Sequence, residues 1–348
     1  MPTSFLLPVV FTILNLRVYF RSIQKDHPAV KTANGKYTAR FGRNTKTQQV
    51  DRLLITDRFS AMIIWKKGRT WRIRIMIQDI EPSRLDNAFT PGMPDTKDSV
   101  LIFDGDGRIL VSIQDGGIRF TTGKDVPADG TVYLFSVDGD RYFCALPPAE
   151  TTLPGFEFRS VRELRDAGSG KELFAAFTAY HLWRWYADNR RCGRCGGENR
   201  CHSAERALQC SCCGHVIYPR INPAVIVGVI KGDSLLITRY RKGYAHNALV
   251  AGFTEIGETL EQTVQREVME ETGVRVHNIR YYKSQPWGMA QDLLMGFYCD
   301  AENESVIRMD PNELKYAEWV QREDIVRQPN NLSLTNEMMR IFKEGKKV

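Results

Sequence analysis

The chain has 348 residues, of which 43% are hydrophobic and 26% are charged, and its formal net charge is +7. This length allows two or three domains, and the apolar content suffices for packed cores, which excludes a chain too polar to fold. The charge is uneven, because residues 1–75 hold 15 Lys and Arg, 3 Asp and no Glu. Those residues therefore carry +12, and residues 76–348 carry −5.

Residues 1–75 form a basic extension with two interpretations. One is an arm that binds nucleic acid or a membrane surface. The other, which we favour, is a segment outside the native protein, translated from a wrongly chosen start codon, because the composition becomes ordinary at Met76. The apolar run Phe5–Leu16 contains Pro8, has no basic residue before it and is too short to span a bilayer. We therefore expect no signal peptide, no membrane partner and a cytoplasmic location.

Residues 76–190 are predicted to form a β-rich N-terminal domain with one helix. Two stretches with Asp-Gly turns, residues 99–113 and 132–146, each predict a β-hairpin. A helix is predicted at Glu172–Asp188, where an aromatic stripe at helical spacing indicates packing rather than a cofactor site. His181 within this stripe is interpreted as a histidine that is satisfied in the core or at an interface.

Residues 191–220 are predicted to form a zinc ribbon. Two C-x2-C pairs, separated by fourteen residues, can each supply two corners of a tetrahedral thiolate site, and their members are Cys192, Cys195, Cys210 and Cys213. Four thiolates leave no open position, so the Zn²⁺ would be structural. A disulfide framework fits poorly in a chain without an export signal. Four spare ligands lie nearby, namely Cys201, Cys212, His202 and His215.

Residues 221–348 contain short strands and two helices. The strands are predicted at residues 224–230, 234–238, 281–283 and 293–298, and the last helix at Thr335–Lys343. The helix between them begins after Thr259, which forms a capping-box pattern with Gln262, and Gly273 is suited to its C-terminal end. One face of this helix is apolar and points to a core, through Leu260, Val264 and Val268.

Three carboxylates, Glu267, Glu270 and Glu271, share another side of the same helix. Crowded like charges repel unless a cation or a basic residue neutralises them. Oxygen ligands suit Mg²⁺ or Mn²⁺, which also bind phosphate. The alternative is a solvated acidic face, the usual meaning of a charge run. Arg266 favours the metal site, because it is placed to hold Glu258 across the preceding turns.

The stretch from Gly252 to Val274 matches the pattern G-x5-E-x7-R-E-U-x-E-E-x-G-U, where U is apolar. It resembles the Nudix box, the signature of hydrolases that cleave nucleoside diphosphates linked to another group. The resemblance implies an α/β/α sandwich with a mixed sheet. With a ribbon before the box and Ser284–Trp287 after it, the chain resembles the NADH pyrophosphatase (NAD⁺ diphosphatase) subfamily, some of whose members remove NAD caps from RNA.

The resemblance also implies roles for single residues. The divalent cation would be held by Glu267, Glu270, Glu271, Glu313 and the carbonyl of Ala251, and the catalytic set adds Arg266 and Glu258. Substrate contacts would come from Phe253, Gln285, Pro286, Trp287, Tyr218, Glu205 and Arg162. Phe253 matches a ring that stacks on nicotinamide, with core packing as its alternative. The alternative for Glu313 and for Arg162 is that each is an ordinary surface charge.

The implied reaction is hydrolysis of NADH or NAD⁺ to nicotinamide mononucleotide and AMP, by a homodimer. The subfamily motif S-Q-P-W-P-F-P-x-S is only half kept, because Gly288–Asp292 replaces its second half. This departure affects the expected substrate more than the expected reaction. ADP-ribose, dinucleoside polyphosphates and NAD-capped RNA therefore stay open as substrates, and so do a nucleotide-sensing regulator without activity and a ribbon that reads nucleic acid.

Overall fold

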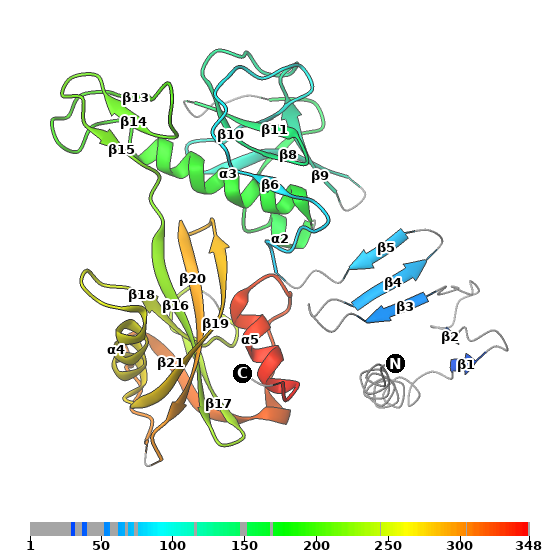
Figure 1. The fold of residues 1–348 in the computed structure, drawn as a ribbon, viewed down its shortest axis with the longest axis vertical. Coiled ribbons are helices and arrows are strands. Elements are labelled where there is room, and N and C mark those ends of the chain that lie inside the picture. Colours follow the sequence, from blue (N-terminus) through cyan, green and yellow to red (C-terminus); the bar gives the residue numbers. More distant parts are fainter. Residues whose placement is uncertain are drawn as a thin grey trace, which may run out of the picture. The chain divides into compact units, whose positions relative to one another are not determined.

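The computed structural model describes residues 76–346, apart from 115–116, 147–151, 168–169, 244 and 304, and the backbone of five strands nearer the N-terminus (Figure 1). The chain divides into two compact units, Met1–Ile73 and Arg74–Val348. The apolar run Phe5–Leu16 and the side chains of residues 1–75 lie outside the described residues. Both interpretations of the basic extension, and the domain boundaries after residues 190 and 220, therefore stay predictions.

The first unit contains two small antiparallel sheets. Strand β1 (Ala29–Lys31) pairs with β2 (Tyr37–Ala39), and β3 (Arg52–Ile55), β4 (Met62–Lys66) and β5 (Arg69–Arg72) form the other sheet. In the part of the chain that the structure describes, no helix has the length and apolar character needed to cross a membrane.

The second unit begins with a β-rich domain built on seven strands. In sequence they are β6 (Leu85–Asp86), β7 (Ser99–Leu101), β8 (Arg108–Gln114), β9 (Gly117–Thr122), β10 (Thr131–Val137), β11 (Asp140–Ala145) and β12 (Glu157–Ser160). Their order in the sheet is β12-β8-β9-β7-β11-β10-β6. The predicted hairpin at residues 132–146 is confirmed as β10–β11.

The other predicted hairpin, at residues 99–113, is confirmed only next to its turn, where the two strands are still paired. Phe103 and Ile109 form an isolated bridge there. Beyond the bridge the two strands separate, because β9 lies between them and pairs with both β8 and β7. The turn residues therefore indicated that the chain reverses direction, but they did not indicate with which neighbouring strand each half of the hairpin pairs.

Helices α2 (Leu164–Ala167) and α3 (Lys171–Asp188) complete this domain, and α3 confirms the predicted helix. Phe174, Phe177 and Trp185 are buried in the domain core, as the packing interpretation required. A ring nitrogen of His181 lies 2.8 Å from the carbonyl oxygen of Arg220, and burial lowers the pKa of this histidine.

The ribbon follows as three short antiparallel strands, β13 (Asn199–Cys201), β14 (Leu208–Cys210) and β15 (Val216–Ile217). After it comes a six-stranded sheet made of β16 (Asn222–Lys231), β17 (Ser234–Tyr240), β18 (Val250–Phe253), β19 (Val276–Trp287), β20 (Asp292–Ala301) and β21 (Leu314–Gln321). The order is β19-β20-β16-β17-β21, with β18 paired to β16. Only β16 and β20 run parallel, so the sheet is mixed.

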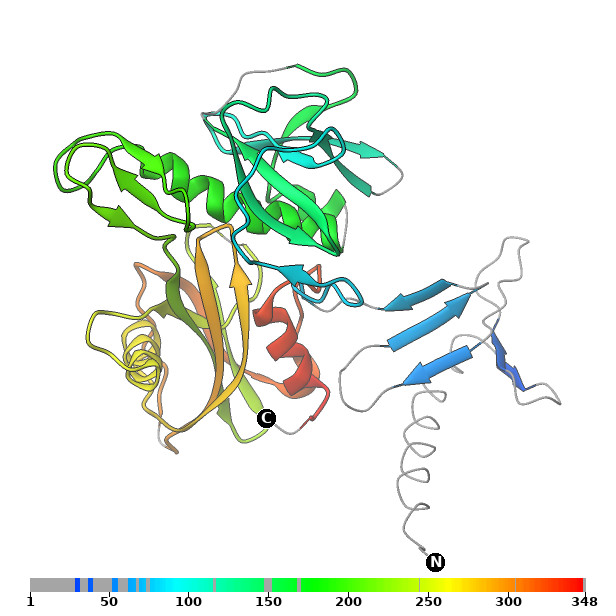
Figure 2. The same cartoon turned by 45° about the horizontal axis from the view of Figure 1, so that its top comes forward.

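This sheet is covered on both faces, by α4 (Leu260–Thr272) and by α5 (Leu334–Lys343), which follows the short helix η1 (Arg322–Asp324) (Figures 1 and 2). Side chains alternate along a strand. Val225 and Val227 therefore join the core under α4, whereas Ile226 joins the core under α5. The predicted α/β/α sandwich with a mixed sheet is confirmed.

Strand β19 is longer than predicted. The sequence indicated a strand at residues 281–283 followed by a loop, yet Ser284 to Trp287 continue the strand and pair with Met295 to Asp292 of β20. Two irregularities in the ladder, after His277 and after Tyr281, interrupt the alternation along this strand. They explain why its length is not visible as a regular pattern in the sequence.

Candidate functional site

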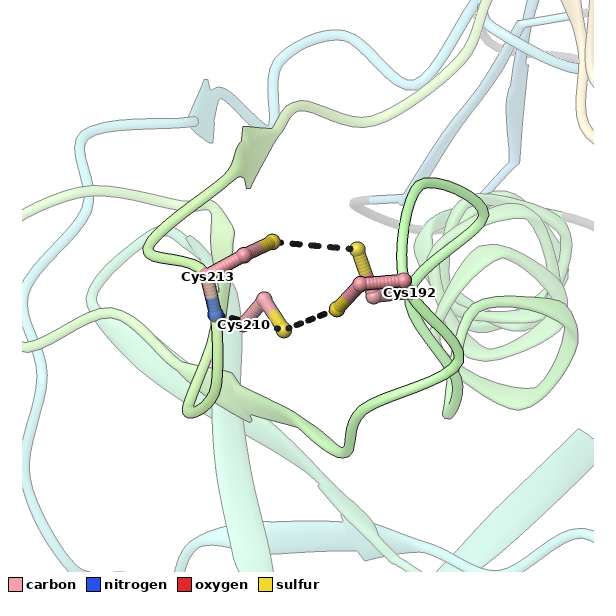
Figure 3. A group of neighbouring side chains, drawn as sticks. Cys192, Cys210 and Cys213 are labelled. Atoms are coloured by element: carbon pink, nitrogen blue, oxygen red, sulfur yellow. Dashed lines mark hydrogen bonds between the residues drawn. The ribbon is translucent and has the colours of Figure 1, made fainter.

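The ribbon brings four cysteine sulfurs together. The Sγ atoms of Cys192, Cys195, Cys210 and Cys213 all lie within 4.8 Å of one another. The pair Cys192–Cys213 is 3.8 Å apart and the pair Cys195–Cys210 is 3.5 Å apart (Figure 3). A tetrahedron with Zn–S bonds of 2.3 Å places its sulfurs about 3.8 Å apart. The four thiols therefore fit a structural zinc ion.

The spare ligands have other positions. The cluster found among the described residues includes neither Cys201, Cys212, His202 nor His215. His202 instead accepts hydrogen bonds from the backbone N–H groups of Ala204 and Glu205, at 3.3 and 3.2 Å. This ring therefore shapes the loop between β13 and β14.

Helix α4 forms as its sequence predicts. The Thr259 hydroxyl accepts a hydrogen bond from the N–H of Gln262, and the Gln262 side chain accepts one from the N–H of Thr259. Gly273 ends the helix in the left-handed conformation, with φ of 68°. Val264 and Val268 are fully buried. Capping and burial together fix which way the carboxylates of this helix face.

Arg266 links three of the predicted site carboxylates. Its guanidinium donates to both oxygens of Glu258, at 2.6 and 2.9 Å, which confirms the expected pair. It also donates to Glu267 at 2.8 Å, to Glu270 at 3.0 Å and to the carbonyl oxygen of Phe253 at 2.9 Å. The hydrogen bonds from Arg266 lower the pKa of Glu258 to about 2. Glu258 and Arg266 thus brace the loop before α4.

Glu271 is the most buried carboxylate of the cluster. Only 2% of the residue is exposed. Burial raises the pKa of its carboxyl to about 8, and the nearby charges of Glu267 and Glu313 act in the same direction. Burial likewise raises the pKa of Glu267. Glu313, which precedes β21, is exposed, and its charge acts on both helix carboxylates. A buried acid group among other acids is neutralised by a proton or a cation.

Gly252 makes room for this cluster. A Cβ atom built on Gly252 would lie 1.9 Å from the Cδ carbon of Glu267, which no side chain tolerates. Glu270 differs from its neighbours, because 60% of its side chain is exposed. Glu271 is therefore buried and Glu267 half-buried, whereas Glu270 and Glu313 are exposed.

Tyr240, at the end of β17, was not predicted from the sequence. Its hydroxyl lies 3.2 Å from a carboxylate oxygen of Glu271, and it accepts a hydrogen bond of 3.0 Å from the N–H of Ala251. Tyr240 lies outside the box, and a tyrosine at the end of a strand carries no signal of its own. The oxygens of Ala251, Glu267 and Glu271 are hard ligands of the kind that Mg²⁺ and Mn²⁺ prefer.

The predicted substrate contacts fall into three groups. Phe253 is 52% exposed, beside Gly252. Tyr218 is 61% exposed, and its hydroxyl donates to Glu205 at 2.7 Å, so the structure pairs these two ribbon residues. Exposed rings of this kind offer faces on which a base or nicotinamide can stack. These three residues are open to a ligand.

The second group is engaged within the protein. Gln285 is fully buried, donates to Gln78 and to the carbonyl oxygen of Leu332, and accepts from the N–H of Leu334 at the start of α5. The Trp287 ring meets Phe177 edge to face, with centroids 5.8 Å apart.

Two predicted contacts remain exposed. Pro286 is exposed between Gln285 and Trp287, and Arg162 is exposed in the turn before α2. Among the described residues, no hydrogen bond or ion pair joins Arg162 to the carboxylates of the box. Among the described residues the structure therefore gathers the four predicted zinc ligands into one cluster, whereas the roles of the predicted carboxylate ligands and substrate contacts stay predictions.

Comparison with known proteins gives a consistent result. Residues 220–340 match the family model of the NUDIX domain. The chain is 40% identical over 169 residues to the NAD-capped RNA hydrolase NudC of Shigella dysenteriae and to that of Escherichia coli. Each match covers 48% of this chain and 64% of the relative, so the chain spans less than two thirds of the relatives' length.

A solved Nudix hydrolase from Nitrosomonas europaea is also similar, with 21% identity and a TM-score of 0.40, over 44% of this chain and 91% of that chain. The family match covers β16 to the greater part of α5, which includes the capped helix, its three carboxylates and Glu313. Residues 220–340 therefore match the Nudix domain, and part of the chain is similar to proteins named NAD-capped RNA hydrolase NudC.

Proposed function

We propose that the protein hydrolyses the pyrophosphate bond of NADH or NAD⁺, free or as the cap of an RNA, and releases nicotinamide mononucleotide. The observation that carries this proposal is the complete Nudix box, in which Glu271 is buried, Glu267 is half-buried, and Arg266 links Glu267 and Glu270 to Glu258. The similarity to proteins named NAD-capped RNA hydrolases supports the choice of substrate. A regulator without activity is disfavoured, because all the box carboxylates are present.

Glu267, Glu270, Glu271, Glu313 and the Ala251 carbonyl would hold Mg²⁺ or Mn²⁺. When bound, such ions neutralise phosphate charge in the transition state and lower the pKa of an attacking water. Glu270 or Glu271 would accept the proton from this water. Arg266 keeps Glu258 and Glu267 in place through the contacts described above, and the exposed Phe253 ring would stack on nicotinamide.

The ribbon would complete the enzyme. Its four thiolates would hold zinc and keep Tyr218 and Glu205 together as a contact for the second nucleotide. Gln285, Pro286, Trp287 and Arg162 stay predicted contacts, and a homodimer and a cytoplasmic location stay proposals. Gly288–Asp292, which packs against α3, favours a second candidate substrate class, namely another nucleoside diphosphate derivative such as ADP-ribose.

The test is incubation of the protein with NADH, NAD⁺, ADP-ribose or NAD-capped RNA, each with Mn²⁺ or Mg²⁺ and each with EDTA. We expect mononucleotide release from a nicotinamide substrate that stops in EDTA. Faster cleavage of ADP-ribose than of NADH and NAD⁺ would favour the second candidate. Tight binding of a dinucleotide without cleavage of any substrate would overturn the enzyme and favour a nucleotide sensor.

A further inference from the structure

The hydroxyl of Tyr240 connects three elements of the Nudix domain. Tyr240 ends β17, Ala251 lies in β18 and Glu271 lies in the last turn of α4. The hydroxyl oxygen is 3.2 and 3.4 Å from the two carboxylate oxygens of Glu271, and 3.0 Å from the Ala251 nitrogen. It is also 3.3 Å from the carbonyl oxygen of Ala251. One side chain thus contacts two of the groups proposed as cation ligands.

The direction of these hydrogen bonds follows from proton counting. The Ala251 N–H can only donate, so the tyrosine oxygen accepts from it. The single hydroxyl proton is then left for one acceptor, and the candidates are Glu271, the carbonyl of Ala251 and the carbonyl of Leu249, at 3.5 Å. An ionised carboxylate is the strongest of these acceptors. Tyr240 therefore donates to Glu271 whenever that group is charged.

We infer that Tyr240 is a positioning residue for divalent-cation binding, which fixes the Glu271 carboxylate relative to the Ala251 carbonyl before the cation arrives. This inference rests on the proposed function, because it takes both groups as ligands. Its physical basis is that Ala251 belongs to β18 and Glu271 to α4, so a side chain that contacts both groups restricts their relative positions. Partners of metal ligands typically change metal affinity by roughly 10–100-fold when they are removed.

The experiment compares Tyr240→Phe with Tyr298→Phe in the full chain. Tyr298 is a matched control, because its buried hydroxyl donates to the Met338 carbonyl at 2.7 Å, on the α5 side of the sheet. The probe is Mn²⁺ without substrate, with free Mn²⁺ measured by electron paramagnetic resonance. We expect Tyr240→Phe to weaken Mn²⁺ binding roughly 10–100-fold, and Tyr298→Phe to leave it unchanged. At saturating Mn²⁺ the KM for NADH should be the same in the wild-type protein and in both variants.

Thermal unfolding in EDTA separates positioning from simple loss of stability. If Tyr240→Phe is no less stable than Tyr298→Phe but binds Mn²⁺ more weakly, the inference holds. Unchanged Mn²⁺ affinity in Tyr240→Phe, with affinity lost in Glu271→Gln, would overturn it and leave the proposed function standing. An equal loss of Mn²⁺ affinity in both tyrosine variants would also overturn it. If the wild-type protein neither binds Mn²⁺ nor cleaves any dinucleotide, the proposed function fails, and this inference with it.

Discussion

The ribbon and the carboxylate helix are both suited to metal ions, but they are built differently. The ribbon places four sulfurs at mutual distances that match one tetrahedral ion, and two backbone knuckles supply all of them. The carboxylate cluster draws its oxygens from α4, β18 and the loop before β21, and its charge is shared with Arg266 and with protons. A closed thiolate set suits a permanent structural ion, whereas an adjustable set of oxygens suits an ion that works during a reaction.

Glu271→Gln should produce the largest change. The amide keeps the shape of the side chain but removes the buried negative charge, so kcat should fall by roughly three orders of magnitude or more. The zinc content and the far-ultraviolet circular dichroism should not change. Glu261→Gln, an exposed position on the same helix, is the control and should keep normal turnover. Near-normal hydrolysis by Glu271→Gln would refute the metal assignment.

Cys192→Ser tests the zinc site of the ribbon. Cys192 is buried, and the loss of one thiolate opens a structural zinc site. We expect zinc content, measured by elemental analysis after dialysis, to fall close to zero and the ribbon to lose protection from proteolysis. Cys212→Ser, next to the cluster but outside it, should keep its zinc. Loss of zinc from Cys212→Ser but not from Cys192→Ser would show that the ligand set is wrong.

The carboxylate site should respond to pH. A proton on Glu271 competes with the cation, and the pKa of this group is raised to about 8. Mn²⁺ affinity should therefore rise by up to about tenfold per pH unit below pH 8 and level off above it. Calorimetric titration between pH 6 and about 9 measures this slope. A flat profile would mean that Glu271 is already ionised at pH 6.

The same pKa shift has a consequence for the metal-free protein. A carboxyl whose pKa is raised by folding stabilises the fold while it is protonated. The contribution of Glu271 to the free energy of unfolding is therefore fully present below about pH 4.5, and it is lost as the pH rises through about 8. In EDTA, chemical denaturation should show the free energy of unfolding declining over this range in the wild type, and less so in Glu271→Gln.

Gly252→Ala should have the smallest overall effect of the series, a moderate loss of stability with a partial loss of turnover. The added Cβ would meet the Glu267 carboxylate, and relief of such overpacking typically costs about 1–3 kcal/mol. Turnover should fall with it, because Glu267 must move. Gly193→Ala in the ribbon is the matched control, since a Cβ there meets nothing within 4 Å. If the two variants have the same free energy of unfolding and the same turnover, the lack of space for a Cβ does not explain the glycine at position 252.

Some features were accessible from the sequence because they depend on local spacing. The cap at Thr259, the end at Gly273 and the apolar face of α4 are set by residues within one helix. The cysteine pairs are equally local, since each knuckle fixes two thiols. The Arg266–Glu258 contact spans eight residues and follows from the motif.

Other features depend on contacts far apart in the chain, which spacing does not encode. Tyr240 reaches Glu271 across 31 residues, and Gln285 reaches Gln78 across 207. The extension of β19 and the insertion of β9 between β7 and β8 were missed for the same reason, because strand pairing is decided by partners elsewhere in the sheet. The sequence thus predicted the cysteine cluster and the Arg266–Glu258 pair, but not the contacts of Tyr240 and Gln285.

The turn between β19 and β20 has a practical consequence for anyone who shortens this protein. Trp287 and Met289 pack into the core that α3 helps to form, and Gln291 donates to the His181 carbonyl. A Cβ on Gly288 would lie 2.0 Å from the Phe177 carbonyl oxygen, so the turn and α3 are in close contact. A shortened chain that begins at residue 220 would keep all the carboxylates of the Nudix box. It would, however, expose the apolar side chains of Trp287 and Met289 to water, and we expect it to aggregate.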